Sequence, residues 1–353
     1  MRSRTLLAAA MAAAAAVVPL SAAPASAAPA PVATGLIGPL SFSIEDGTFV
    51  VAQSFGGKLT RFSADGASKD LVTNDPAIEI GAVETRGRGL LYALTGKTAA
   101  NKPFARLMHR AADGTVTTRG NLRAFETRRN PDRGQNYGFQ DLSKKCAAKL
   151  PAGQQVRKYK GKVDSHPYAT TVLAGGDAVV ADAGGNDILR VTPAGKVSVI
   201  AVLPPQPFVF TKAAAKSQDM PACVVGKTLN YEPVPTDVEV HKGQLYVTTL
   251  PGGPENPSLG ARGSVYRVDP DSGSWTRIGR GFLGATDLAV AKSGKVYVAE
   301  LFGNRVSTIE GFRRKKVASV NQPSAVEIAD GKLWSTQDTF GQDGGSLVRV
   351  PRG

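Results

Sequence analysis

The stretch Gly176-Asp-Ala-Val-Val-Ala-Asp182 decides the fold, because its pattern occurs six times along the 353 residues. In each copy a glycine is followed by one variable residue, then by two or three apolar residues and a small or polar one. The other five copies begin at Gly47, Gly89, Gly243, Gly294 and Gly331. Short strands repeated every few tens of residues are typical of a repeat architecture. They predict an all-β fold, a six-bladed β-propeller with one repeat per blade.

The third repeat shows the four expected strands of a blade most clearly. Strands are predicted over 167–173, 178–182, 188–192 and 197–203, and glycine-rich turn signals separate them. The last repeat supplies only three strands before the chain ends. We therefore expect the N-terminal segment 31–36 to complete blade 6, which would close the ring and remove exposed sheet edges.

The first 27 residues have the pattern of a secretory signal. Arg2 and Arg4 precede an apolar stretch that is too short to span a membrane, and small residues end at Ala27. This predicts cleavage after Ala27, a secreted extracellular protein and a single propeller domain over 28–353. No later stretch has the roughly 20 apolar residues of a transmembrane helix, so no transmembrane segment is expected.

The chain is basic, with a formal net charge of +14, or +12 without the two signal arginines. Its basic residues are scattered, which favours a solubilising surface charge, although anionic cell-wall polymers or lipid head groups remain candidate partners. The one dense run, 313–316, is expected in a strand-to-strand turn. Because no aromatic residues alternate regularly with the basic ones, we expect no nucleic-acid partner. We also expect a monomeric protein.

Three insertions lengthen the repeats, over 122–163, 204–234 and 250–263. All three connections should emerge on one face of the propeller, where loops usually carry function. Helical patterning occurs only in the first, which predicts a short helical insertion between blades 2 and 3. In the same insertion, Tyr137 and Phe139 either line a ligand groove or anchor the insertion on the propeller.

The only two cysteines, Cys146 and Cys223, lie in the two larger insertions. Export to an oxidising compartment favours pairing, and two cysteines allow one intramolecular connectivity. We predict a disulfide between them; the alternative is a pair of buried thiols.

Several polar residues are expected near the channel mouth on the insertion-bearing face. The candidate ligand-binding residues are His166, Tyr168, Asp182, Asn186, Asp237, Asp287, Glu300 and Asn304. Carboxylates such as Asp182 and Glu300 are the ligands that calcium prefers, so they are the candidate metal ligands. The alternative is that these two carboxylates accept hydrogen bonds from nearby backbone amides, while Asn186 and Asn304 adopt tight-turn conformations.

From Leu122 onward the sequence resembles the ScyD/ScyE-type secreted propellers, which are relatives of the NHL-repeat proteins. The resemblance rests on Leu122-Arg-Ala-Phe-Glu126 with Asn130-Pro-Asp132, on Asp164-Ser-His-Pro-Tyr168, on Ala181-Asp-Ala-Gly-Gly-Asn-Asp187 and on Val234-Pro-Thr-Asp237. It implies an exported six-bladed propeller and supplies no catalytic set. The chain departs from the family at His166, where asparagine is expected, and in the length of segment 133–162.

These observations favour a secreted propeller that binds a ligand or partner through its insertion-bearing face without chemistry of its own. The ligand would be a small molecule, a polymer or a protein. The alternative is a calcium-dependent, hydrolase- or lactonase-like enzyme that uses the channel-mouth carboxylates. A third hypothesis is a wall-associated protein whose charge matters most.

Overall fold

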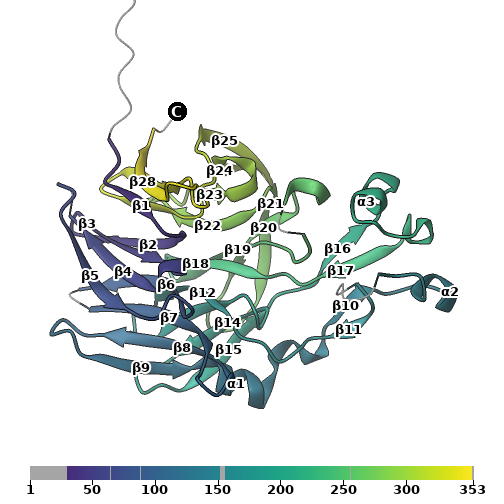
Figure 1. Cartoon of the computed structure of the whole chain (residues 1–353), viewed down its shortest axis with the longest axis horizontal. Helices are drawn as coiled ribbons and strands as arrows, with labels where there is room; N and C mark the ends of the chain where they lie inside the picture. Colours follow the sequence, from purple (N-terminus) through teal and green to yellow (C-terminus); the bar gives the residue numbers. More distant parts are fainter. Residues whose placement is uncertain (1–29, 64, 88, 152–155, 255, 352–353) are drawn as a thin grey trace, which may run out of the picture. The chain divides into compact units, whose positions relative to one another are not determined.

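The computed structural model describes residues 30–63, 65–87, 89–151, 156–254 and 256–351. The expected signal segment 1–27 lies outside these residues. From Pro31 onward the described residues belong to one compact unit. It is built mostly of antiparallel strands (Figure 1).

Twenty-four of its strands form six consecutive four-stranded groups. Group 1 comprises β2 (Pro39–Glu45), β3 (Thr48–Gln53), β4 (Lys58–Phe62) and β5 (Ser68–Thr73). Group 2 comprises β6 (Glu79–Arg86), β7 (Gly89–Lys97), β8 (Pro103–Arg110) and β9 (Val116–Asn121). Group 3 comprises β12 (Pro167–Val172), β13 (Ala178–Asp182), β14 (Asp187–Val191) and β15 (Val197–Val202).

Group 4 comprises β18 (Pro235–His241), β19 (Gln244–Thr249), β20 (Gly263–Val268) and β21 (Trp275–Phe282). Group 5 comprises β22 (Ala285–Val290), β23 (Val296–Glu300), β24 (Arg305–Glu310) and β25 (Arg313–Ser319). Group 6 comprises β26 (Val326–Ala329), β27 (Lys332–Gln337), β28 (Gly345–Val350) and the N-terminal β1 (Ala33–Leu36).

The first strands of the groups form a ring. β2, β6, β12, β18, β22 and β26 each contact the next, and β26 contacts β2. Hydroxyl groups bridge neighbouring groups. Thr236, for example, donates to the Ala285 carbonyl at 2.9 Å, and Ser324 donates to the Pro39 carbonyl at 2.7 Å. The second bond joins group 6 to group 1, so it lies where the two ends of the repeat array meet.

The two ends of the chain share one sheet, as expected. β1 pairs antiparallel with β28, with Ala33 opposite Leu347 and Leu36 opposite Gly345. Leu36 is buried in an apolar cluster with Phe42 of group 1 and Leu347 of group 6. Because β1 covers the outer edge of β28, the last repeat has four strands although its own segment supplies three.

The apolar core lies between neighbouring groups. Strand β13 is buried on both of its faces, which explains why apolar and polar residues do not alternate in its sequence. All five residues of β13 are buried. Successive side chains point to opposite faces of a strand. Val179 accordingly packs against Leu245 and its group 4 neighbours, while Val180 packs against Leu107 and its group 2 neighbours. Both faces of the sheet are covered, and each fully buried valine or leucine contributes about 1.5–3 kcal/mol.

Two features differ from the sequence-based expectations. The basic run that begins at Arg313 lies in strand β25 rather than in a turn. β25 also pairs in parallel with β21, at Arg313 and Arg280, so groups 4 and 5 form one eight-stranded sheet. The apolar pattern of individual strands carries no information about such an outer-edge contact.

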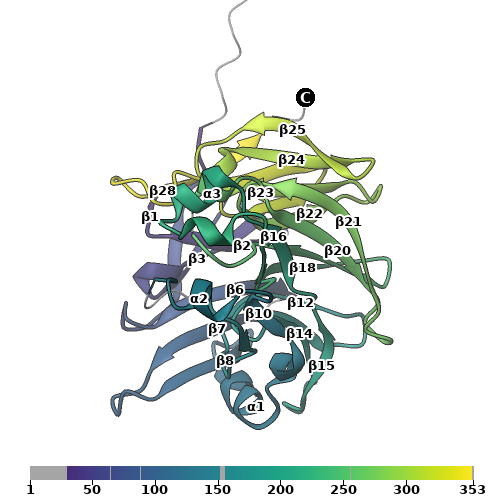
Figure 2. The same ribbon diagram turned by 90° about the vertical axis from the view of Figure 1, so that its right-hand side faces the viewer.

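The first two insertions combine into a further four-stranded sheet. Its order is β11 (Tyr159–Lys160), β10 (Asn136–Phe139), β17 (Thr228–Tyr231) and β16 (Gln206–Val209). It lies beside the groups, together with the short helices α2 (Lys144–Ala147) and α3 (Lys212–Ser217) (Figures 1 and 2). The expected helical insertion is present as α1 (Leu122–Arg129), but α3 lies in the second insertion, where none was predicted.

A disulfide joins these insertions, which confirms the predicted pairing of Cys146 and Cys223, with a Cα–Cα distance of 5.9 Å. Cys146 and Val224, the residue after Cys223, belong to an apolar cluster that includes Phe139 and Phe210, whose ring centroids are 5.0 Å apart. Tyr137 is fully buried and donates to Asp132 at 3.0 Å. Tyr137 and Phe139 therefore anchor the first insertion rather than line a groove.

Candidate functional site

Asp182 ends β13 and organises the segment that precedes β12. Its carboxylate accepts hydrogen bonds from the Ser165 hydroxyl and the His166 amide, both at 2.6 Å, and from the Gly185 amide at 3.1 Å. This is the backbone-binding role that the sequence left as an alternative. Asp182 is buried, with 1% of its surface exposed.

His166 links group 3 to group 2. Its Nε2 atom lies 2.9 Å from a carboxylate oxygen of Glu79, and its ring centroid lies 6.2 Å from that of Tyr168. Burial lowers the pKa of His166, but the Glu79 carboxylate and nearby aspartates raise it above its ordinary value on balance. The expected proximity of His166, Tyr168 and Asp182 is therefore present.

Asn186 and Asn304 occupy equivalent positions in groups 3 and 5. Both have a left-handed backbone, with φ of 57° and 49°. The side-chain oxygen of Asn186 accepts from the Val234 amide at 3.2 Å, and that of Asn304 accepts from the Gln322 amide at 2.9 Å. Each asparagine thus holds the connection that leads into the next group, which is a structural role for both.

Asp237 and Asp287 belong to a set of acidic residues on the ring of first strands. Asp237 accepts from the Leu288 amide at 2.8 Å, and Asp287 accepts from the Val326 amide at 3.1 Å. The set, called here the first-strand carboxylates, also contains three residues that sequence reasoning missed: Glu84, Glu239 and Glu327. Each of these three glutamates is a single acidic residue in a strand that is otherwise mostly apolar, so the strand pattern did not reveal it.

The pKa values of all five first-strand carboxylates are raised. Burial is the main cause throughout, and charge repulsion between members adds to it in most. The pKa of Glu84 rises to about 8, and that of Asp237 rises to about 7. These shifts favour the protonated form of the first-strand carboxylates.

Glu300 is buried at the end of β23 in a network of its own. It pairs with Arg305 at 2.9 Å and with Arg314 at 2.6 Å, and it accepts from the Leu283 amide and the Ser307 hydroxyl. In the described part of the chain no hydrogen bond or ion pair joins it to Asp182, and no group of three or more His, Cys, Asp or Glu side chains there could hold a metal ion. A calcium ion shared by Asp182 and Glu300 stays a prediction.

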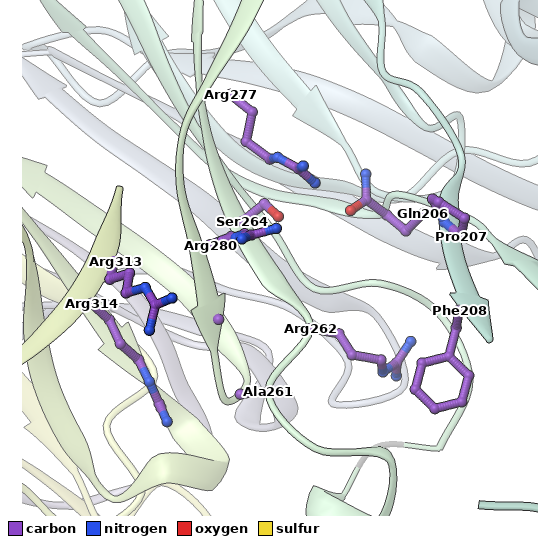
Figure 3. A pocket seen from close by; sticks show the side chains of 11 residues that line it. Gln206, Pro207, Phe208, Ala261, Arg262, Ser264, Arg277, Arg280, Arg313 and Arg314 are labelled. Carbon is purple, nitrogen blue, oxygen red and sulfur yellow. The ribbon is translucent and has the colours of Figure 1, made fainter. Parts of the chain in front are cut away.

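A cavity of about 720 Å³ lies where the second and third insertions meet groups 4 and 5 (Figure 3). Five arginines line it, and we call it the arginine cleft: Arg262, Arg277, Arg280, Arg313 and Arg314. Gln206, Pro207, Phe208, Ala261, Ser264 and Gly281 complete the lining. No acidic side chain is among these lining residues. The buried Glu300 carboxylate pairs with Arg314, so the other four arginines give the cleft its positive charge.

Neighbouring groups orient most of the arginines. Arg262 donates to the carbonyl of Gly252 at 3.0 Å and lies 4.5 Å above the Tyr231 ring. Arg277 and Arg280 lie 5.8 and 5.3 Å from the Phe312 ring centroid. Figure 3 shows the Arg277 guanidinium and the Gln206 amide pointing toward one another across the cleft. Aromatic contacts of this kind hold a guanidinium without neutralising its charge.

Sequence reasoning missed the arginine cleft, although it noted the run that begins at Arg313. The five arginines come from an insertion, from β21 and from β25. A second cavity, of about 480 Å³, is lined by both signs of charge, with Glu45, Asp46 and Asp113 beside Arg61 and Arg110. The absence of acidic lining residues therefore distinguishes the arginine cleft from that cavity.

No helix of the described residues is long and apolar enough to cross a membrane. Neither a protein-family model nor a curated relative matches the sequence. Solved structures do show similarity. The soluble aldose sugar dehydrogenase of Escherichia coli, in its apo form, matches with a TM-score of 0.53 at 11% identity, over 92% of this chain and 99% of that chain.

Two lyase structures are also similar. A streptogramin B lyase matches with a TM-score of 0.50 at 14% identity, over 92% of this chain and 86% of that chain. The virginiamycin B lyase of Staphylococcus aureus, solved with quinupristin, matches with a TM-score of 0.51 at 15% identity, over 90% of this chain and 85% of that chain. At such identities the likeness concerns the fold alone. The chain therefore has a β-propeller fold.

Proposed function

We propose that this chain is an exported six-bladed β-propeller that binds an anionic ligand in the arginine cleft, without chemistry of its own. One observation carries the binding proposal: a cavity of about 720 Å³ is lined by five arginines and by no acidic residue. We also propose that the chain is related to the ScyD/ScyE-type propellers, and this proposal rests on the sequence motifs between Leu122 and Asp237.

The six-blade count is supported by the six four-stranded groups and by the ring of their first strands. β1 supplies the fourth strand of group 6, as a closed propeller requires. In this interpretation, the pairing of β21 with β25 is a local contact between the outer edges of blades 4 and 5.

Export is supported by the signal pattern of residues 1–27 and by the disulfide between Cys146 and Cys223. Disulfides persist mainly in oxidising compartments outside the cytoplasm. Mass measurement of the protein recovered from culture medium tests export, because the expected chain starts at Ala28. A retained Met1 would contradict it.

The guanidinium groups that line the cleft indicate which class of ligand it binds. A guanidinium presents a planar fork of donors that matches carboxylate, sulfate and phosphate groups. Phe208 adds an apolar surface to the lining. Several arginines spread over one cavity suit a ligand with several anionic groups, and we therefore favour an acidic polymer, such as one of the cell wall.

Binding of fluorescently labelled polyphosphate and of polygalacturonate tests the proposal. The variant R277A/R280A removes two arginines from the cleft. Its matched control, R267A/R349A, removes two exposed arginines that are not part of the cleft lining. At about 1.5 kcal/mol for each charge-assisted contact, the cleft variant should bind roughly 100-fold more weakly.

The control should retain nearly all of the affinity. Equal losses in both variants would mean that net charge, rather than the cleft, attracts the polymer, and that would favour the third hypothesis. Absence of binding to either probe at low salt would contradict the proposal. The hydrolase alternative has no specific observation in its favour, because similarity to enzymes at 11–15% identity concerns the fold.

A further inference from the structure

A third cavity, of about 400 Å³, lies among the three insertions, and we call it the tyrosine pocket. Its lining includes Tyr159 of the first insertion, Gln218, Tyr231 and Glu232 of the second, and the backbone of 252–253 in the third. None of the described residues in this lining belongs to the six groups of strands. The volume falls in the range of roughly 300–1,000 Å³ that is usual for small-molecule sites. The pocket is therefore a property of the insertions rather than of the propeller scaffold.

The apolar part of the pocket wall is fixed by the packing of the insertions. Val156, Met220 and Tyr231 line the pocket and belong to the same buried apolar cluster as Cys146, whose disulfide joins the first two insertions. Gly253 has a φ of 108°, and a Cβ atom there would lie 2.7 Å from Cε1 of Tyr231. Only glycine lets the third insertion approach the ring so closely. A wall that is fixed in this way lowers the entropic cost of binding a ligand.

Two polar side chains of defined orientation add hydrogen-bonding groups to the lining. Glu232 accepts a hydrogen bond from the Tyr159 hydroxyl at 3.0 Å. The side-chain nitrogen of Gln218 donates to the Ser258 hydroxyl at 2.9 Å. A carboxylate has about four acceptor positions, and a primary amide has two N–H donors and an acceptor oxygen, so one bond does not exhaust either group. An apolar wall with a few placed polar groups is typical of a site for a small molecule or for one unit of a polymer.

Cationic side chains of the protein already lie near both tyrosine rings of the pocket. The Arg262 guanidinium lies 4.5 Å from the centroid of Tyr231, and Nζ of Lys162 lies 4.8 Å from that of Tyr159. A ligand ammonium group would have to compete with these cations for the rings. Burial also raises the pKa of Glu232, which makes its carboxyl group a weaker counter-charge. These contacts favour an uncharged, hydroxyl-bearing unit over a cationic one.

Tyr231 separates the tyrosine pocket from the arginine cleft. Its ring contacts Arg262, and its centroid lies 6.2 Å from that of Phe208; both of these residues line the cleft. Arg262 also donates to the carbonyl of Gly252, which is part of the pocket wall. Figure 3 shows Arg262 and Phe208 at the same end of the cleft. A ligand at that end therefore has the tyrosine pocket beside it, and an elongated ligand can occupy both cavities.

We propose that the tyrosine pocket binds a sugar ring of an acidic polysaccharide whose carboxylates lie in the arginine cleft. A pyranose ring has apolar C–H faces, which pack against aromatic and aliphatic side chains, and hydroxyl groups, which bond to a carboxylate and an amide. A polyuronate carries such a ring and a carboxylate in every unit, whereas polyphosphate has no ring. This inference rests on the proposed function and names the class of polymer.

Binding of oligogalacturonate and of polyphosphate with equal charge tests the inference. The variant Q218A/E232Q removes polar groups of the pocket, and the amide at position 232 can still accept from Tyr159. It should bind oligogalacturonate roughly 10-fold more weakly, because it loses hydrogen bonds to the sugar hydroxyls. Its affinity for polyphosphate should stay the same or rise, because one negative charge is removed.

The matched control is Q342A/D330N. It changes an exposed glutamine and an exposed aspartate in turns of group 6 that line neither cavity. The control should bind both probes like the wild type.

An equal loss for both probes in Q218A/E232Q, or no loss for oligogalacturonate, would overturn the inference and leave the arginine cleft as a site for polyanions in general. Failure of the wild type to bind either probe would instead contradict the proposed function and this inference with it. Q218A alone should weaken oligogalacturonate binding about 5-fold. It decides the question if the double variant fails to fold, because Gln218 lies outside the buried apolar cluster.

Discussion

Arg314 donates to a carboxylate oxygen of Glu300 at 2.6 Å, so a buried acid at the end of β23 neutralises one arginine of the cleft. Arg305 pairs with the same carboxylate at 2.9 Å. Glu300 therefore serves to position cationic side chains, and its chemistry is tied to the arginine cleft rather than to the ring of first strands.

The variant E300Q should destabilise the protein by about 3 kcal/mol, because it leaves two arginines without their shared counter-charge. Guanidinium denaturation measures the change. R305A alone should cost less, since Arg314 still balances the carboxylate. The calcium content of E300Q should equal that of the wild type. Loss of calcium in E300Q would instead support the shared site of Asp182 and Glu300.

Reduction of the disulfide should loosen the insertions before it affects the propeller. The bond spans a separation of 77 residues, and the chain-entropy model gives it about 4 kcal/mol. Because Cys146 and Val224, next to Cys223, belong to the apolar cluster of the insertions, the effect should be confined there. Limited proteolysis of C146S/C223S should therefore give early cuts within 130–160 and 204–230. Two free thiols in the unfolded, unreduced wild type would contradict the bond.

Removal of residues 28–36 should destabilise the protein and promote aggregation. The deletion exposes the edge of β28 and uncovers the cluster around Leu36 and Phe42. Exposed sheet edges pair with other chains. Size-exclusion chromatography and thermal unfolding measure the two effects. Deletion of residues 28–30 alone is the control, and an equal melting temperature in both deletions would contradict closure by β1.

The first-strand carboxylates should make stability fall as pH rises. The folded-state pKa of Glu84 is about 8, above its ordinary value of 4.5, because burial and neighbouring charges disfavour ionisation. A raised acid pKa contributes stability that is present below pH 4.5 and lost as pH approaches 8. Stability measured between pH 5 and 9 should show a loss on the order of 4 kcal/mol. E84Q should flatten this profile, and an unchanged profile in E84Q would contradict the assignment.

Much of the fold could be predicted from local sequence. The four strands expected in the third repeat match β12 to β15 to within one residue at each boundary. The pairing of β1 with β28 and the bond between Cys146 and Cys223 were predicted as well. These features depend on strand periodicity, on counting strands and on a single possible cysteine pairing, all of which are visible without tertiary structure.

Helix α3 could not be predicted, because its six residues, Lys212–Ser217, carry little pattern of their own. It is helical where Ala214 and Ala215 pack into the cluster of the insertions, with a cap from Thr211. Short helices are stabilised mainly by tertiary packing rather than by propensity.

The sequence by itself determined the strands, the closure of the chain ends and the disulfide, since each follows from local pattern or from counting. Tertiary structure alone decided the arginine cleft. Arg262, Arg277 and Arg313 reach one cleft from three separate segments of the chain. Charged residues carry no periodicity that reveals their partners, and long insertions can follow many paths. Which charges meet is therefore settled only when the insertions pack against the groups.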